Sequence, residues 1–334
     1  MEHLPVEVIG NILSLLGSAR DVVIASATCK KWREAWHNHL HSLSFNYCDW
    51  PLYHDLTSNR LEILITQTIF QTKALQFLTI FMGDEHEFSA APVIAWLMYT
   101  RDSLRQLRYN VRTTPSFNII EKCSRQRLEV LILACNSIAG VEPNCTFEVF
   151  ELIGKGTLKV LKIDDVSVIH LDIGDGTENL EIIDVCKFTI MWPKFYHMIS
   201  KASKLYKLRL WGVVFDDEDE VVDIETISGC FPRLTHLSLS YDLRDGVLHY
   251  GLQGLSCLMN VVVLELGWTV ISDLFSVWVA GLLEGCPNLK KLVVYGVVSE
   301  VKTHEECQIL ARFSEFIIQL GRKYRHVKFE FEYD

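Results

Sequence analysis

The sequence predicts an α/β protein in which a short helical N-terminal domain precedes a solenoid of repeated strand, turn and helix. Within the first forty residues, apolar side chains recur three and four positions apart, which is the spacing of amphipathic helices. From residue 40 onward the pattern L-x-x-L-x-L returns along the chain, with the alternation typical of strands. We therefore divide the chain into a helical domain (1–42), a repeat region (43–302) and a C-terminal cap (303–334).

Three short helices are expected in the first domain. The first begins at Pro5, ends at Gly17 and carries an apolar stripe made of Ile9, Ile12, Leu13 and Leu16. Ser18 and Asp21 resemble a capping box at the start of the second helix. The third helix carries four residues at helical spacing: Cys29, Trp32, Arg33 and Trp36. Because three short helices bury little surface by themselves, their apolar faces need a partner in the same chain or in another protein.

The same segment resembles an F-box over residues 3 to 42. The resemblance lies in the opening Leu4-Pro5-Val6-Glu7, the ending Cys29-Lys30-Lys31-Trp32-Arg33 and the gap between them. It implies binding to a Skp-type adaptor, which docks on a cullin. The implied adaptor surface consists of Leu4, Pro5, Glu7, Ile12, Leu13, Leu16, Cys29, Lys31 and Trp32.

Departures from the F-box pattern concern Gly10, Asn11 and Thr28. Gly10 and Asn11 replace larger residues in the first helix, and a glycine inside a helix costs about 1 kcal/mol relative to alanine. Thr28 stands where valine is usual. These departures weaken the expected helices but leave the anchoring residues in place.

The repeat pattern has ten starts, 22 to 35 residues apart, which is close to the period of about 20–29 residues of leucine-rich repeats. The starts are Leu40, Leu75, Leu104, Leu128, Leu158, Leu180, Leu205, Leu234, Val261 and Leu289. Each start predicts a strand of a parallel sheet, followed by a turn and a return segment. An F-box followed by irregular leucine-rich repeats resembles the plant-type F-box/leucine-rich-repeat (F-box/LRR) family.

Two late segments predict helices. Ser272 caps a helix whose expected buried stripe is Leu274, Phe275, Trp278, Val279, Leu282 and Leu283. In the cap, a capping box at 303–306 precedes a helix with apolar positions Ile309, Leu310, Phe313, Ile317 and Leu320. Val327, Phe329 and Phe331 then alternate with charged residues, as in an edge strand.

Residues between the repeat leucines should point to the concave sheet face, where a target protein would bind. Arginine, tryptophan and tyrosine dominate interface energetics, so we centre the recognition patch on Arg209 and Trp211. The predicted target-binding residues are Arg108, Lys162, Asp184, Arg209, Trp211, His236, Glu265, Lys291 and Tyr295. An ordinary solvated sheet face remains the alternative for each of them.

Composition narrows the functional class. The net charge is −10 and no apolar run approaches the length of about 18 residues that a membrane span needs, so neither nucleic acid nor membrane is an expected partner. No signal sequence is evident, and the ten cysteines, without a CxxC pair, indicate reduced thiols in a cytoplasmic or nuclear protein. No catalytic motif appears, and we expect neither catalysis nor a cofactor.

Three other patterns have plain interpretations. The acidic block 216–220 reads as a solvated loop rather than a calcium site. His37, His39 and His41 straddle a helix end, which disfavours zinc. The segment 154–157 lacks the spacing of a phosphate-binding loop and reads as a turn.

The residues and the family resemblance together lead to one main hypothesis. The chain would be a non-catalytic substrate receptor of an SCF-type cullin–RING ubiquitin ligase. It would raise the rate of modification by proximity alone. Two alternatives stay open: an F-box/LRR scaffold that does not act in a ligase, and a receptor that requires a small molecule. Members of the F-box/LRR family are often longer than this chain, so the resemblance implies that repeats are missing around residues 140–150.

Overall fold

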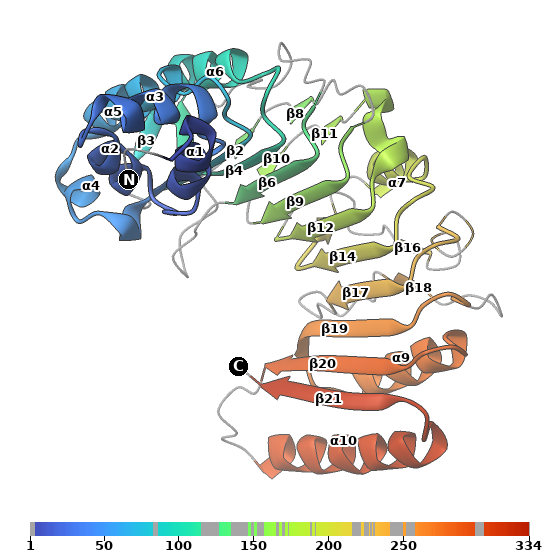
Figure 1. Cartoon of the computed structure of the whole chain (residues 1–334). Coiled ribbons are helices and arrows are strands. Elements are labelled where there is room, and N and C mark those ends of the chain that lie inside the picture. The colour runs from blue at the N-terminus through green and yellow to red at the C-terminus, as the bar shows by residue number, and fades with distance from the viewer. Residues whose placement is uncertain are drawn as a thin grey trace. The chain divides into compact units, whose positions relative to one another are not determined.

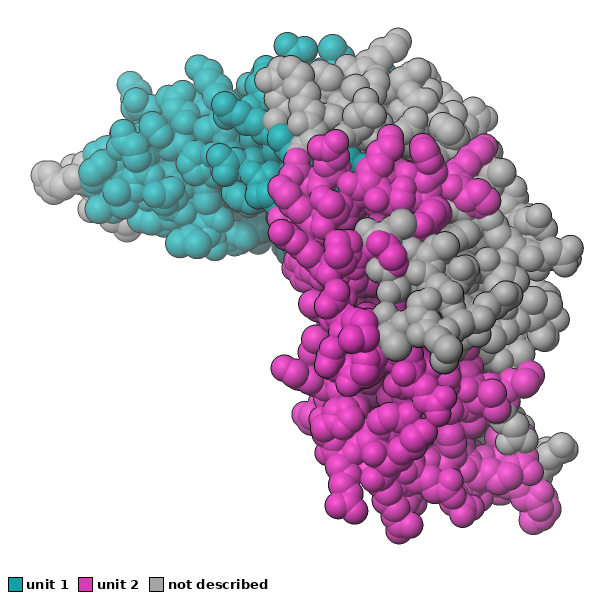
Figure 2. Space-filling model, turned by 90° about the vertical axis from the view of Figure 1, so that its right-hand side faces the viewer, with its two compact units in different colours: residues 1–177 teal, residues 178–334 magenta. Residues whose placement is uncertain are grey.

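The structure is a computed structural model of the 334-residue chain. It describes residues 4–82, 86–114, 127–134, 146–147, 150–151, 157–164, 167–168, 171–172, 174–187, 189–190, 192–215, 222–223, 227, 229, 231–240, 250–251, 258–297 and 304–333. The chain forms two compact units, residues 1–177 and 178–334 (Figure 2). The expectations for residues 154–156 and 216–220, and for the capping residue at 303, lie outside the described residues.

Unit 1 (residues 1–177) combines helices with a parallel sheet. Its helices are α1 (Val6–Ser14), α2 (Ala19–Ser26), α3 (Lys30–His39), α4 (Leu52–Asp55), α5 (Ser58–Phe70) and α6 (Ala90–Tyr99), with a 3-10 turn η1 (Tyr47–Asp49). Its main strands are β1 (Ser42–Asn46), β2 (Phe77–Phe81), β4 (Gln106–Asn110), β6 (Val130–Ala134) and β9 (Val160–Asp164), paired in that order.

Unit 2 (residues 178–334) continues with the same kind of repeat. Its helices are α7 (Trp192–Ile199), α9 (Asp273–Gly285) and α10 (His304–Lys323). Its main strands are β12 (Ile182–Cys186), β14 (Lys207–Trp211), β17 (His236–Ser240), β19 (Val263–Val270), β20 (Lys291–Val297) and β21 (Lys328–Tyr333). They pair in that order, all parallel, and Figure 1 shows them side by side with a common direction.

All ten predicted repeat starts are confirmed, because each main strand from β1 to β20 begins two residues after a predicted start. Every start residue is at most 2% exposed. The strand leucines stack in register, for example Leu43–Leu78–Leu107 in unit 1 and Leu208–Leu237–Leu264 in unit 2. Burying each such side chain contributes about 1.5–3 kcal/mol, so these rows are the core that holds successive repeats together.

The return segments hold more strand than the sequence predicted. Short parallel pairs follow the main strands: β3 (Glu87–Ser89) with β5 (Arg112–Thr114), β7 (Thr146–Phe147) with β10 (Ser167–Val168), β8 (Phe150–Glu151) with β11 (Leu171–Asp172), β13 (Thr189–Ile190) with β15 (Val214–Phe215), and β16 (Val222–Asp223) with β18 (Tyr250–Gly251). A further 3-10 helix, η2, covers Gly174–Asn179. Two- and three-residue strands carry too little alternation to be recognised from sequence.

Helix caps and stripes were predicted with mixed success. Ser272 caps α9 as expected, since its Oγ accepts a hydrogen bond from the Phe275 N–H at 3.1 Å. Ser18 precedes α2, but its side chain makes no capping hydrogen bond, so the predicted capping box is wrong. Leu274 was also placed wrongly: it is 61% exposed, because the buried side of α9 begins at Phe275.

Candidate functional site

The helical domain presents an apolar surface on α1 and α2. Ile9 and Leu13 are completely buried against the other helices. Six large apolar side chains nevertheless remain at least 36% exposed: Val8, Ile12, Leu15, Leu16, Val23 and Ile24. Exposed apolar side chains at this density are typical of a protein-interaction site.

The predicted adaptor residues divide by exposure. Leu4, Lys31 and Trp32 are half-buried, and Leu13 is at 0% exposure, inside the domain. The exposed members are Pro5, Glu7, Ile12, Leu16 and Cys29. The sequence reasoning missed Val8, Leu15, Val23 and Ile24, because apolar residues adjoining a helical stripe read as core. Their assignment to the adaptor surface stays a prediction, as does that of the nine original residues.

Gly10 is a packing requirement of the helical domain. A Cβ atom added to Gly10 would lie 2.5 Å from the Cβ of His39 and 2.6 Å from its carbonyl oxygen. Glycine therefore allows α1 to approach the end of α3 closely. The departure from the F-box pattern at this position is explained by contact within the chain.

We expect Gly10→Ala to destabilise unit 1 by about 1–3 kcal/mol, because the added methyl overpacks the α1–α3 contact. Urea unfolding monitored by circular dichroism measures the effect. Gly321→Ala, in the last turn of α10 with open space around the added methyl, is the control and should be neutral or slightly stabilising. Equal stability of the Gly10 variant and the wild type would contradict the proposed contact.

The helical domain is bonded directly to the first repeats. The Trp36 Nε1–H donates to Thr72 Oγ1 at 2.9 Å, and inside the domain the His41 N–H donates to Ser14 Oγ at 3.1 Å, next to the first strand. Nδ1 of His37 lies 2.6 Å from the Gln71 carbonyl oxygen, and Nδ1 of His41 lies 3.1 Å from that of Ala74. These two imidazole rings therefore contact the segment before β2 and help to join the helical domain to the first repeats. No group of three or more metal-ligating side chains occurs in the described ranges.

Seven of the nine predicted target-binding residues lie on the sheet face of unit 2, the face opposite to the leucine rows. They are Asp184, Arg209, Trp211, His236, Glu265, Lys291 and Tyr295. The other two belong to unit 1, where Arg108 on β4 is exposed and Lys162 on β9 is half-buried.

Trp211 lies flat on this sheet face and is only 6% exposed. Its Nε1–H donates to Ser238 Oγ at 2.6 Å, and its ring meets the edge of Tyr295 with centroids 5.1 Å apart. The Arg209 guanidinium stacks 3.7 Å from the ring centroid. The side chain crosses Gly267, where a Cβ atom would lie 2.6 Å from the indole. Trp211 is therefore packed against the sheet face and does not project from it into solvent.

Charges on the sheet face are largely paired with one another. Arg209 Nη1 lies 3.4 Å from Asp184 Oδ1, and Lys291 Nζ lies 2.6 Å from Glu330 Oε2. His236 Nε2 lies 2.9 Å from Glu265 Oε1. Burial works to raise the pKa of Glu265, but the hydrogen bond and charge of His236, helped by Lys207 and Ser238, outweigh it and the pKa is lowered.

The lowered pKa gives a testable pH dependence. Ionised Glu265 stabilises the fold above its ordinary pKa of 4.5, and this contribution disappears as the pH falls through the lower folded-state value. We expect Glu265→Gln to lose about 1 kcal/mol of stability at neutral pH, with the difference vanishing in acid. Urea unfolding across pH measures it, with the exposed Glu284→Gln as control. A constant difference at every pH would contradict this account.

Two comparisons with known proteins bear on these surfaces. The F-box-like family model matches residues 1–43. An F-box/LRR-repeat protein of Arabidopsis thaliana is 54% identical over 419 aligned residues, covering 100% of both chains. The chain belongs to the F-box/LRR-repeat family. At least 85 of the aligned positions (419 less 334) have no residue in this F-box/LRR protein, a length equal to about three of its repeats.

The family assignment confirms the recognition of an F-box in residues 3–42 and of a plant-type F-box/LRR chain. It fits the fold, in which α1–α3 precede regular parallel strands. Among the helices that the structure describes, none combines the length and the apolar character that a membrane span requires.

Proposed function

We propose that this F-box/LRR protein is the substrate-recognition subunit of an SCF-type cullin–RING ubiquitin ligase. The observation that carries the proposal is the exposed apolar surface of α1 and α2, within the segment that matches the F-box-like family. A Skp-type adaptor covers this surface and connects the chain to a cullin. The repeats hold the target protein, and the chain contributes proximity rather than chemistry. Its site of action is the cytoplasm, the nucleus or both.

The scaffold alternative loses its sequence support. It depended on the departure at Gly10 and Asn11, and the close approach of Gly10 to His39 explains the first of these by packing. Asn11 is exposed on α1, where a polar residue is ordinary. An F-box that keeps its own core and its exposed apolar residues supports a working adaptor surface.

Purification of the tagged full-length chain with a co-expressed Skp-type adaptor tests the proposal. We expect a stable equimolar complex on size-exclusion chromatography. A chain that is folded by circular dichroism but elutes apart from the adaptor would overturn the proposed function.

A further inference from the structure

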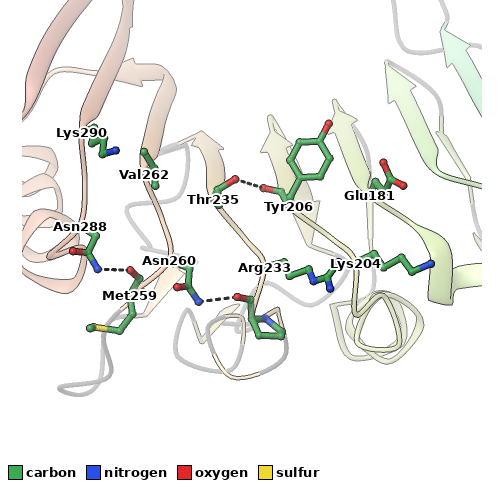
Figure 3. Close-up of a pocket in the computed structure, with 11 residues that line it drawn as sticks. Glu181, Lys204, Tyr206, Arg233, Thr235, Met259, Asn260, Val262, Asn288 and Lys290 are labelled. Atoms are coloured by element: carbon green, nitrogen blue, oxygen red, sulfur yellow. Dashed lines mark hydrogen bonds between the residues drawn. The ribbon is translucent and has the colours of Figure 1, made fainter.

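A groove follows the edge of the unit 2 sheet at which the strands begin (Figure 3). Its volume is about 860 Å³, and five successive repeats contribute to it. Each contributes residues immediately before its strand, so the groove is distinct from the sheet face that carries Arg209 and Trp211. The described residues place all of its walls in unit 2.

The frame of the groove is built by bonds between neighbouring repeats. Asn260 Nδ2 donates to the Pro232 carbonyl at 2.7 Å, and Asn288 Nδ2 donates to the Met259 carbonyl at 2.8 Å (Figure 3). The Tyr206 carbonyl accepts from the N–H groups of Thr235 and His236 at 3.0 Å each. Because these backbone groups are already satisfied, a ligand would bind through the side chains that line the groove.

Three of those side chains are exposed cations: Lys204, Arg233 and Lys290. Glu181 is the one acidic residue among the described lining residues. The contact that Lys204 Nζ makes is to a neutral acceptor, Asn179 Oδ1, at 2.5 Å. Within the described part of the chain, no carboxylate lies at ion-pair distance from Arg233 or Lys290.

Four cations outside the groove in unit 2 do have a carboxylate partner. Arg209, Lys291, Lys323 and Lys328 each lie within 3.4 Å of a carboxylate. In a chain with a net charge of −10, the groove therefore has three cations against one carboxylate among its described lining residues. Such a local field attracts acidic ligands.

Apolar surface lies between the cations. Tyr206 is 40% exposed and Met259 is 52% exposed, with Pro232 and Val262 beside them. Lys204 and Lys290 precede β14 and β20, which are three strand spacings apart in the sheet. At about 4.8 Å per spacing, this span of about 14 Å corresponds to four or five residues of an extended peptide.

We propose that this groove binds an extended acidic segment of the target protein. Its carboxylates would pair with Lys204, Arg233 and Lys290, and an apolar side chain would lie against Tyr206 and Met259. The inference rests on the proposed function in one respect: it assumes that the ligand is part of the target protein that the receptor binds. The groove would act beside the sheet face, whose charges are paired internally.

The test measures binding of a short fluorescent peptide of alternating glutamate and leucine to the full-length chain by anisotropy. A peptide with glutamine in place of glutamate is the matched probe. We expect the glutamate peptide to bind at least about tenfold more tightly, since several exposed ion pairs of up to about 1 kcal/mol each add to the apolar contact. Raising the salt concentration should weaken this preference. Equal binding of the two peptides would overturn the proposal.

Variants locate the site. Lys204→Glu with Arg233→Glu should abolish the preference for the glutamate peptide, whereas Arg322→Glu, an exposed cation near the end of α10, should preserve it. A preference that survives the double variant, or that is lost equally in the control, overturns the groove assignment. Concentration-dependent dimerisation that the double variant removes would also overturn it, because the occupant would then be a second copy. Adaptor capture, measured in parallel, reports separately on the proposed function.

Discussion

Replacing Ile12 and Leu16 with aspartate is expected to reduce capture of the Skp-type adaptor by at least about a hundredfold. Both side chains are exposed, at 36% and 40%, so the free chain should tolerate the change. In the complex, two carboxylates would be buried against apolar surface without partners, which costs several kcal/mol. Isothermal titration calorimetry of the purified chain with the adaptor measures the loss.

The control for this experiment is Ile63→Asp, which places one aspartate on α5, at an isoleucine of the same unit that is 57% exposed. It should bind the adaptor like the wild type. Leu13→Asp is unsuitable, because Leu13 is completely buried and its loss of binding would report unfolding. Unchanged binding by the Ile12 and Leu16 double variant, with normal circular dichroism, would contradict the assignment of the apolar surface.

Trp211→Ala is expected to destabilise unit 2 by about 3–5 kcal/mol, the usual cost of removing a buried tryptophan. The variant loses the hydrogen bond to Ser238, the stacking of Arg209 and the contact with Tyr295. It also opens a space above Gly267, where the indole now lies. Urea unfolding monitored by circular dichroism measures the change in free energy.

Tyr206→Ala is the matched control for Trp211, because Tyr206 lies in the same repeat but is 40% exposed. Its loss should cost less than about 1 kcal/mol, as is usual for surface positions. Similar stability of the two variants would contradict the flat, buried placement of Trp211. The large expected effect also means that loss of target binding in a Trp211 variant would not by itself locate the target site.

The repeat architecture could be predicted because the leucine pattern recurs at a nearly regular spacing along the sequence. A leucine pattern with a spacing of 22 to 35 residues is typical of a parallel arrangement that buries the leucines, and the ten main strands from β1 to β20 follow their predicted starts. The F-box could be predicted for a different reason. Its Leu-Pro opening and Cys-Lys-Lys-Trp-Arg ending form a local sequence motif, which can be recognised without knowledge of any tertiary contact.

Features that depend on contacts between distant residues could not be predicted. Alternation correctly placed Trp211 on the sheet face, but it does not say that the ring lies down across Gly267, which is 56 positions later in the chain. From the sequence, Gly10 is expected to destabilise the first helix. In the structure, His39 lies so close to Gly10 that a larger residue would clash with it. The sequence places Leu13 and Leu16 on one helical stripe, yet only Leu13 is buried, because α1 ends at Ser14 and Leu16 lies in the turn that follows it.

The edge groove escaped prediction for the same reason. Its cations are single residues before the strands of three different repeats, and each looks ordinary in its own segment. Their convergence on one groove, where Glu181 is the one acidic residue among the described lining residues, appears only when the repeats are stacked. The pairing of charges on the sheet face is likewise a property of strand register, as in Arg209 opposite Asp184.

Recovery of cullin is the most direct test of the central claim that this F-box/LRR protein is a ligase receptor. The tagged wild-type chain and the Ile12 and Leu16 double aspartate variant would be purified from plant cells, and cullin and Skp-type adaptor would be quantified in each. The account predicts both proteins with the wild type and neither with the variant. Adaptor without cullin in the wild-type sample, or equal cullin in both samples, would contradict it.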